Sequence, residues 1–320
     1  MTEMKTILVT GAAGFIGSHT SKKILEDGNR VIGLDNLNDY YNPEWKKQNL
    51  ANLDKFENFK FIKADIRDLE ALQKIAATYK IDTIIHLAAR AGVRPSIEDP
   101  ILYERVNVKG TINLLEISKA FKIMQFIFAS SSSVYGNQEK IPFSETDNVD
   151  NPISPYAATK KACELIAYTY SHLYQINCIG LRFFTVYGPA GRPDMAPYLF
   201  TEAILKDQPI KKFGDGSSSR DYTYINDIVS GIVAASELDR SYELINLGNS
   251  SPITLNEFIT TLENIIGKSL KFEQLPMQPG DVKQTCADIT KAQQLLGYQP
   301  NTSLEDGMKK FVAWYENNRL

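Results

Sequence analysis

A tyrosine and a lysine stand four residues apart at Tyr156 and Lys160, and a run of serines that includes Ser131 precedes them. Residues four apart on a helix share one face, so the two side chains would be neighbours. The ammonium would favour the tyrosinate, because a nearby opposite charge stabilises the ionised form. A tyrosine base with a hydroxyl beside it can take the proton from an alcohol while hydride leaves the same carbon. We therefore predict Ser131, Tyr156 and Lys160 as a catalytic set.

A glycine-rich turn near the start of the chain supports this reading, which the spacing alone would not carry. Gly11, Gly14 and Gly17 lie between an apolar run, Thr6–Val9, and a helical pattern, Ile16–Asp27. In that context the first glycine permits a tight turn, the second lets amides approach a pyrophosphate, and the third allows close helix packing. The start of the helix then favours the bound anion. The segment predicts a dinucleotide site.

The residue at the end of the second apolar run indicates which dinucleotide binds. Asp35 can accept hydrogen bonds from the adenosine ribose hydroxyls, and it would repel a 2′-phosphate, so NAD is predicted rather than NADP. Asp65 follows the third run, where it could contact the cofactor, cap a helix, or do both. The other residues predicted to contact NAD follow strand-like runs or open the first helix: Phe15, Ile16, Asn36, Ile66, Leu87, Ala88 and Ala89.

Composition narrows the class of protein. The 320 residues are 43% hydrophobic and 23% charged, as in a soluble globular protein. The net charge of −3 gives no basic excess of the kind that nucleic-acid binding needs, and no apolar run is long enough to span a bilayer. The N-terminal residues run directly into a strand pattern, which predicts no signal peptide. The three cysteines and three histidines are scattered, so we expect no disulfide, no metal site and a cytoplasmic location.

Periodicity predicts an α/β fold. Continuous apolar strands alternate with helical patterns, which is typical of a Rossmann-like doubly wound parallel sheet. After about residue 183 proline and glycine become frequent, so we expect an NAD-binding domain over 1–183 and a smaller α/β substrate domain over 184–320, with about 221–250 returning to the first. The expected strands are Thr6–Val9, Val31–Leu34, Phe59–Ile62, Thr83–Leu87, Phe126–Ala129 and Cys178–Arg182, and the first helices Ile16–Asp27, Leu69–Tyr79, Tyr103–Ala120 and Tyr156–Tyr174.

Taken together, the motifs resemble the extended short-chain dehydrogenase/reductase family, and most of all its nucleotide-sugar epimerases. The resemblance covers essentially the whole chain. It rests on their order and combination: Gly11–Gly17, His86–Ser96, Ser130–Gly136, Tyr156–Lys160, Leu181–Pro189, Arg192–Met195, Arg220–Tyr222 and Pro279–Asp281. It implies NAD as the cofactor, a UDP-sugar as the substrate and a homodimer, with the helix Tyr103–Ala120 beside the Tyr156 helix as one candidate contact.

The resemblance also implies roles for single residues. Ser131 would supply the catalytic hydroxyl, Tyr156 would be the base, and Lys160 would also contact the nicotinamide ribose. The remaining positions would line the cofactor (Phe184), face the sugar or diphosphate (Thr185), hold the nucleotide phosphates and ribose (Arg220, Asp281), or limit the substituent on the sugar (Thr285). For Arg220, an ion pair with Asp215 or Asp221 is the weaker alternative.

The two residues after Ser131 bear on the choice of reaction. In related 4,6-dehydratases an Asp-Glu pair follows the catalytic hydroxyl, and related uronate decarboxylases usually carry a Glu near it, whereas this chain has Ser132 and Ser133. C4 epimerisation through a transient 4-keto sugar is therefore favoured over elimination. The serines, together with Arg192, could hold a substrate carboxylate, which favours UDP-glucuronate. Alternatively, the serines satisfy backbone groups and Arg192 pairs with Asp194.

Other substrates and functions stay open at the level of sequence. The segment Lys212–Arg220 and the small Ala190 also suit a UDP-glucose/UDP-galactose epimerase, and Thr285 leaves room for an N-acetylated sugar. A nucleotide-sugar dehydratase or decarboxylase, a net oxidoreductase and a non-catalytic NAD sensor are the remaining alternatives, because a fold does not fix a function.

Overall fold

The large sheet of the fold has seven strands, all parallel, in the order β10-β6-β5-β4-β1-β2-β3. The computed structural model describes residues 3–276 and 282–320. Strands β4 and β1 are buried almost throughout, as continuous apolar runs in a sheet covered on both faces should be. The strands of this sheet are β1 (Thr6–Thr10), β2 (Arg30–Asp35), β3 (Phe59–Lys63), β4 (Thr83–His86), β5 (Gln125–Ser131), β6 (Asn177–Phe183) and β10 (Tyr242–Leu247).

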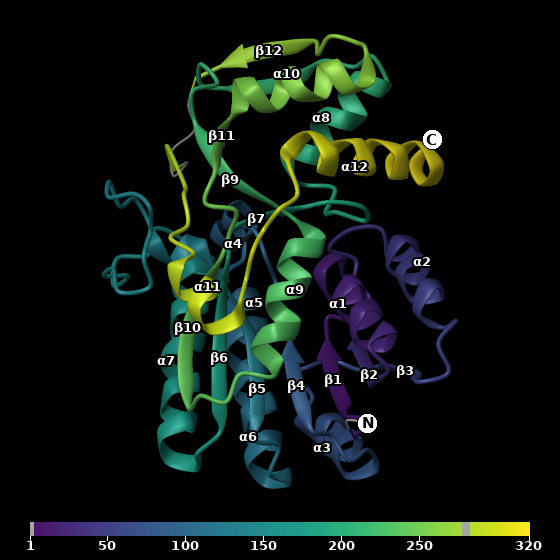
Figure 1. Cartoon of the computed structure of the whole chain (residues 1–320), viewed down its shortest axis with the longest axis vertical. Helices are drawn as coiled ribbons and strands as arrows, with labels where there is room; N and C mark the ends of the chain where they lie inside the picture. The colour runs from purple at the N-terminus through teal and green to yellow at the C-terminus, as the bar shows by residue number, and fades with distance from the viewer. Residues whose placement is uncertain (1–2, 277–281) are drawn as a thin grey trace.

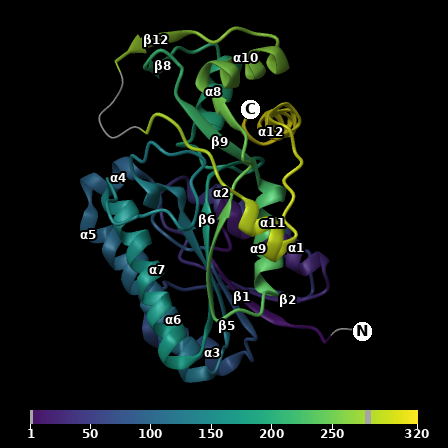
Figure 2. The same cartoon turned by 60° about the vertical axis from the view of Figure 1, so that its left-hand side comes forward.

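Helices cover both faces of this sheet (Figures 1 and 2). On one face α1 packs on α9, and Ile24 and Ile228 belong to one apolar core; on the other, α3, α6 and α7 enclose a second core that contains Leu72 and Leu114. The helices of this part are α1 (Phe15–Glu26), α2 (Pro43–Leu53), α3 (Leu69–Thr78), α4 (Val93–Glu98), α5 (Pro100–Tyr103), the π-helix η1 (Glu104–Lys109), α6 (Gly110–Phe121), the 3-10 helix η2 (Ser132–Tyr135), α7 (Pro155–Tyr174), α9 (Ile225–Ser236) and α11 (Thr290–Leu296).

A smaller part is built beyond the carboxyl ends of the strands, at the top of Figure 1. It holds a three-stranded sheet in the order β11-β9-β7 and a parallel pair, β12-β8, around a third apolar core that contains Phe258 and Phe311. Its elements are β7 (Thr185–Tyr187), α8 (Ala196–Leu205), β8 (Ile210–Phe213), β9 (Ser219–Tyr224), β11 (Pro252–Thr254), α10 (Leu255–Ile266), β12 (Phe272–Leu275) and α12 (Leu304–Arg319).

The predicted doubly wound sheet is confirmed, one predicted helix needs correction, and one helix was missed. The helix expected over Tyr103–Ala120 is divided into α5, η1 and α6, and α2 was not predicted at all. Strand β10 pairs with β6, and α9 packs on α1. The segment 225–247, in the second half of the chain, therefore lies on the large sheet. The division into 1–183 and 184–320 stays a proposal. Among the described helices, none combines the length and apolarity needed to cross a membrane.

Candidate active site

A cavity of about 1150 Å³ is lined by residues from the carboxyl ends of the large sheet and from the smaller part. It includes the place where the strand order reverses between β1 and β4, which is where ligands bind in open α/β sheets. Every described residue predicted for the site contributes to its lining: Gly11, Gly14, Phe15, Ile16, Gly17, Asp35, Asn36, Asp65, Ile66, Leu87, Ala88, Ala89, Ser131, Ser132, Ser133, Tyr156, Lys160, Phe184, Thr185, Arg192, Arg220 and Thr285. Asp281 lies outside the described residues.

The glycine turn between β1 and α1 leaves no space for larger residues. Gly11 has φ +74°, and a Cβ added there would lie 2.8 Å from the backbone nitrogen of Ala88. A Cβ on Gly17 would lie 2.0 Å from the Gly11 carbonyl oxygen. The turn therefore brings the backbone at the start of α1 to the cavity, where its free N–H groups favour an anion.

Acidic residues mark the far end of the cavity. Asp35 ends β2, is 7% exposed, and accepts hydrogen bonds from the backbone N–H groups of Ala13 and Leu37 at 3.3 and 2.8 Å. Burial raises the pKa of Asp35, against the effect of those hydrogen bonds. Asp65 accepts from Asn36 at 2.9 Å and pairs with Arg67, whose hydrogen bond is the main cause that lowers the Asp65 pKa to about 2. Asp68, and not Asp65, caps α3.

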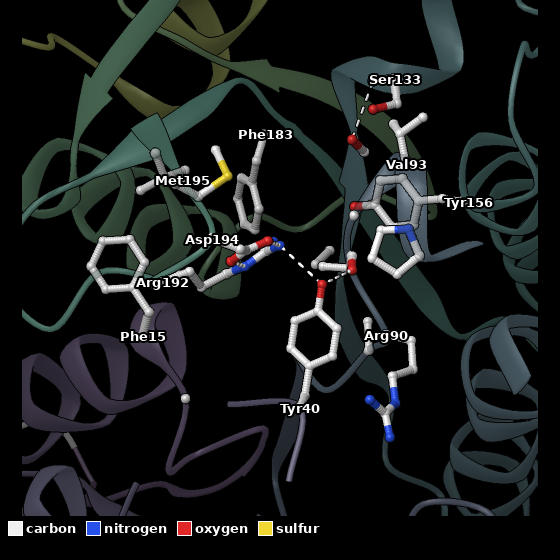
Figure 3. A pocket seen from close by; sticks show the side chains of 18 of the residues that line it. Phe15, Tyr40, Arg90, Val93, Ser133, Tyr156, Phe183, Arg192, Asp194 and Met195 are labelled. Carbon is white, nitrogen blue, oxygen red and sulfur yellow. Dashed lines mark hydrogen bonds and ion pairs between the residues drawn. The ribbon is translucent and has the colours of Figure 1, made fainter. Parts of the chain in front are cut away.

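The catalytic set comes from the end of β5 and the first turns of α7. Ser154 caps α7 by accepting from the Ala157 N–H at 3.1 Å, which places Tyr156 in the first turn, facing the cavity (Figure 3). Lys160, 5% exposed, donates to the carbonyl of Ala129 at 2.8 Å. Ser131 ends β5, and its Oγ accepts from the Ser133 N–H at 3.2 Å. The three predicted catalytic side chains thus line one part of the same cavity.

Two tyrosines that the sequence did not single out, Tyr103 and Tyr40, lie at the site, and Tyr103 contacts Tyr156. The ring of Tyr103 meets that of Tyr156 edge to face, with 6.2 Å between centroids. Tyr103 and Tyr40 both donate their hydroxyls to the carbonyl of Ala91, at 2.7 and 2.6 Å. Burial raises the pKa of Tyr103 and of Tyr40, so both phenols stay protonated donors. Tyr40 belongs to the polar and aromatic stretch after Asp35, and that stretch was the feature of the sequence that could have indicated a site residue here.

Asn107, in the π-helix η1, is another residue that the sequence did not reveal. Its side chain accepts from the N–H of Arg90 at 2.8 Å and donates to the carbonyl of Arg90 at 3.0 Å. It also donates to Thr159 of α7 at 3.1 Å. The π-helical turn therefore ties the loop after β4 to α7, the helix that carries Tyr156, and such turns are frequent at functional sites. An asparagine within a helical pattern gave no warning of this.

His86 is a buried residue at the end of β4. It is 5% exposed, and its ring nitrogens lie 2.8 Å from the Thr10 hydroxyl and 3.1 Å from the Thr111 hydroxyl. Burial, aided by the nearby Lys160, lowers the His86 pKa to about 3. The ring is therefore neutral and adds no charge beneath the cofactor site.

Arg192 reaches the cavity from the loop after β7. Its Nε donates to Asp194 at 3.0 Å, the two side chains form an ion pair, and a longer contact of 3.4 Å joins its Nη2 to the Tyr40 hydroxyl (Figure 3). Burial opposes the positive charge, but Asp194 outweighs it and raises the Arg192 pKa. The pairing with Asp194 is the alternative that the sequence offered for Arg192. It uses the Nε side of the guanidinium.

Other substrate-facing positions lie where the smaller part meets the sheet. Thr185 starts β7, and Phe184 before it is buried among Tyr135 and Phe143. Arg220 on β9 donates to the carbonyl of Ser219 at 2.9 Å. The Asp221 carboxylate accepts from the backbone N–H groups of Asn249, Ser250 and Ala287, so it is committed to the fold.

Few carboxylates line the cavity in the described part of the chain. Within the described part of the chain, the acidic residues of the cavity lining are Asp35 and Asp65 at one end and Asp194, paired with Arg192. Also within that part, no group of three or more His, Cys, Asp or Glu side chains is placed to hold a metal ion. The lining of the site includes a hydroxyl, a phenol and an ammonium, groups that can move a proton to or from an alcohol.

Comparison with known proteins places this site in a family. The model of the GDP-mannose 4,6 dehydratase family matches residues 8–311. A UDP-glucuronate 4-epimerase of Thermodesulfobacterium geofontis is 50% identical to the chain, over 97% of this chain and 96% of that protein.

Solved structures agree with the sequence relatives. The UDP-glucuronic acid 4-epimerase of Bacillus cereus, in complex with UDP-glucuronic acid and NAD, is 39% identical with a TM-score of 0.91, and the match covers 98% of this chain and 99% of that one. The UDP-glucose 4-epimerase of Thermotoga maritima, with UDP-glucose, is 34% identical with a TM-score of 0.90 over the same shares. The chain therefore belongs to the GDP-mannose 4,6-dehydratase family of extended short-chain dehydrogenase/reductases, together with UDP-sugar 4-epimerases.

Proposed function

We propose that the protein is an isomerase that inverts C4 of a UDP-sugar with NAD as its cofactor, and that UDP-glucuronate is its preferred substrate. The observation that carries this proposal is one cavity that contains the glycine turn, Asp35 and the set Ser131, Tyr156 and Lys160. The relatives support it, because proteins similar over nearly the whole chain are named UDP-glucuronate 4-epimerases.

The residues of the cavity fit NAD. Gly11 and Gly17 allow a turn too tight for a Cβ, which brings the backbone N–H groups at the start of α1 to the cavity for a pyrophosphate, and Asp35 provides a carboxylate for ribose hydroxyls. Lys160 and Phe184 would line the nicotinamide end. When bound, NAD accepts a hydride from C4 of the sugar and returns it, so the reaction has no net redox change.

The chain's own residues hold and move the proton. Tyr156 takes the proton of the sugar 4-hydroxyl, with the Ser131 hydroxyl bridging, and gives it back after the 4-keto sugar has presented its other face. Lys160 lies on the same helix face as Tyr156, one turn further along α7. Arg220 would hold the diphosphate, since a planar guanidinium suits phosphate oxygens. Asp281 stays a proposal for the nucleotide ribose.

The serines after Ser131 argue against water elimination and loss of CO₂. Ser132 and Ser133 line the cavity where an acid would have to act. Among the described residues, the acids of the lining are Asp35 and Asp65, at its other end, and Asp194, which is paired with Arg192. Hydrogen bonds from the serines and Thr185 would restrain the substrate carboxylate, which would protect a β-keto acid from decarboxylation. Epimerisation is the reaction that needs no acid beside Ser131 in addition to the set Ser131, Tyr156 and Lys160.

Arg192 provides a prediction about the choice of sugar. Its Nη1 side faces away from the Asp194 contact and can receive a second carboxylate. Replacing Arg192 by Met should raise the KM for UDP-glucuronate roughly 10- to 100-fold, since a charge-assisted hydrogen bond contributes about 1.5–3 kcal/mol. The KM for UDP-glucose should change by no more than about 3-fold, because that sugar brings no charge.

Two matched variants sharpen this measurement. The double variant Arg192→Met/Asp194→Asn also removes the acid that the single variant leaves unpaired. It should still show the raised KM for UDP-glucuronate and so lack the preference for that substrate. Arg240→Met, at an exposed position, should leave both KM values unchanged. Equal effects of Arg192→Met on both substrates would show that Arg192 does not read the carboxylate.

Neutral UDP-hexoses are the second candidate substrates. The pairing of Arg192 with Asp194 leaves the guanidinium partly neutralised, and the chain is also similar to a UDP-glucose 4-epimerase. Thr285, which accepts from the Asp221 N–H at 3.2 Å, adds only modest bulk to the lining, so an N-acetyl group is a further candidate. Separate incubation of the purified protein with each UDP-sugar, without added NAD, tests the proposal; faster conversion of UDP-glucose than of UDP-glucuronate would replace the preferred substrate.

We propose a homodimer that uses the outer face of α7. Leu165, Tyr168 and Leu173 of that helix are 56%, 54% and 64% exposed, which is high for apolar side chains. The helix expected over Tyr103–Ala120 was the other candidate contact, but its residues Leu115 and Ser118 are buried within the chain. The cysteines are free thiols, which supports a cytoplasmic location.

Charge placed on this face should divide the dimer. Leu165→Asp should shift the protein from dimer to monomer in sedimentation velocity, because the charge would have to be buried in the apolar contact. Met4→Asp, at another exposed apolar position, should leave the dimer intact. A wild-type protein that sediments as a monomer at micromolar concentration would refute the dimer.

A further inference from the structure

A buried ion pair lies directly behind the catalytic residues and takes no part in the mechanism above. Arg182 of β6 and Glu164 of α7 are both 1% exposed, and they are joined by two hydrogen bonds, from Nε at 2.8 Å and from Nη2 at 2.9 Å. Burying two charges costs so much solvation that such a pair is weak evidence of a contribution to stability. Its place in the fold therefore asks for another explanation.

The pair connects the two elements that carry the catalytic residues. Ser130, the neighbour of Ser131 on β5, donates its hydroxyl to Glu164 at 2.6 Å. Ser130 and Arg182 are partners in the register of β5 and β6, so their side chains lie on the same face of the sheet, beneath α7. Glu164 follows Lys160 by one helical turn, and Lys160 contacts the carbonyl of Ala129. Two adjacent residues at the end of β5 are thus bonded to two successive turns of α7.

The network also reaches the segment after Ser131. Arg182 Nη1 donates to the hydroxyl of Tyr135 at 2.9 Å, and this hydroxyl donates to Asn246 of β10 at 2.7 Å. Burial raises the pKa of Tyr135 to about 12, so it remains a donor. Tyr135 ends η2, the turn that begins with Ser132. The ion pair therefore fixes the strand end before Ser131 and the turn after it to the same helix.

We propose that Ser130, Glu164 and Arg182 are positioning residues, which hold α7 against the end of β5 so that Tyr156 and Ser131 meet at one substrate oxygen. The inference rests on the proposed function for its kinetic test. A misplacement of about 1 Å between catalytic groups can lower a rate roughly 100-fold, so a rigid connection at this point affects turnover directly. A residue needed only for stability would lower turnover only through loss of folded protein.

Single substitution of Glu164 would leave Arg182 as an uncompensated buried charge and could prevent folding. The informative variant is Ser130→Ala/Glu164→Leu/Arg182→Met, which replaces all three polar groups by apolar ones, while Tyr135 keeps its bond to Asn246. Because buried ion pairs can often be replaced by apolar residues without loss of stability, this variant should fold. Ser130→Ala alone is the milder test. Ser171→Ala is the matched control, since Ser171 on α7 is, like Ser130 on β5, a buried serine with a hydrogen bond, here to the carbonyl of Ser241.

The expected results separate positioning from stability. The triple variant should unfold at a temperature close to wild type and retain NAD, yet show a kcat roughly 100-fold lower with a nearly unchanged KM. The kcat of Ser130→Ala should lie between those of the triple variant and the wild type, and the kcat of Ser171→Ala should equal that of the wild type. A triple variant that folds and turns over within about threefold of wild type would overturn the proposal.

A crystal structure of the NAD-bound triple variant gives a readout that does not depend on the sugar. The separation of the Ser131 hydroxyl from the Tyr156 phenol should change relative to the wild-type holoenzyme. An unchanged separation would overturn the inference even if the proposed epimerase activity holds. A changed separation would support it even if the proposed substrate is wrong, so the two failures are distinguishable.

Discussion

Replacing Tyr156 by Phe should lower epimerisation roughly 1000-fold, while NAD stays bound. The change removes the phenolic oxygen, and with it the base that takes the proton of the sugar hydroxyl; general base catalysis contributes about 10²- to 10⁴-fold. The ring remains, so the edge-to-face contact with Tyr103 and the packing of α7 are kept. Lys160 also keeps its bond to Ala129. Turnover is measured on the purified variant, and bound NAD is measured after release by denaturation.

A second tyrosine of the same helix provides the control. Tyr174→Phe removes a hydroxyl at the far end of α7 and should leave turnover and NAD content at wild-type values. If Tyr156→Phe keeps more than about a tenth of wild-type turnover, Tyr156 is not the base. If it loses NAD as well as activity, the loss of activity reports on the cofactor and not on proton transfer.

Replacing Gly17 by Ala should abolish NAD binding and destabilise the protein by about 3 kcal/mol or more, as overpacking in a tight core does. The added Cβ would lie 2.0 Å from the Gly11 carbonyl oxygen and 2.7 Å from its carbonyl carbon. Both are backbone atoms of the turn itself, so relief requires the turn and α1 to separate. Denaturant unfolding gives the free energy, and titration with NAD gives the affinity.

Gly28 is the matched glycine for this experiment. It has φ +83° with nothing within 4 Å of an added Cβ, so Gly28→Ala has backbone strain of roughly 1 kcal/mol but no clash. This variant should bind NAD as tightly as wild type. Gly17→Ala with wild-type NAD affinity would contradict the placement of the cofactor at this turn.

Local patterns predicted the parts of the site that depend on backbone. The glycine turn is a sequence-local device, since Gly11, Gly14 and Gly17 meet one another within a single turn, and its strand and helix are adjacent in the chain. Asp35 could be located because it ends a continuous apolar strand, and Tyr156 and Lys160 because a helix has a fixed period. The sheet followed from the same alternation of strands and helices.

Contacts between distant segments could not be predicted in this way. Tyr40 and Tyr103 share the carbonyl of Ala91, and Asn107 holds the backbone of Arg90 from a π-helical turn that departs from the helical period. The partners come together only in the fold, and their residue types are ordinary. The pairing of Arg192 with Asp194 was an open alternative. The two residues stand two positions apart in a loop, and the path of the backbone there decides whether their side chains meet.

The network behind the site shows the same limit most clearly. Glu164 and Arg182 are separated by 18 residues, one within an expected helix and the other at the end of an expected strand. Their burial follows from the register of β5 and β6 and from the way α7 lies across them. Sequence patterns give the faces of single elements, whereas a buried ion pair depends on which faces meet.

The most direct test of the account follows the hydrogen at C4 of the sugar. UDP-glucuronate with deuterium at C4 is incubated with the purified protein, without added NAD, and the products are resolved by NMR. The account predicts two C4 epimers that both keep the deuterium, both keep the carboxylate, and form without release of reduced cofactor. Loss of the deuterium from C4, or a product that has lost water or CO₂, would contradict a transient oxidation at C4 in which the same hydride returns and Ser131, Tyr156 and Lys160 handle only the proton.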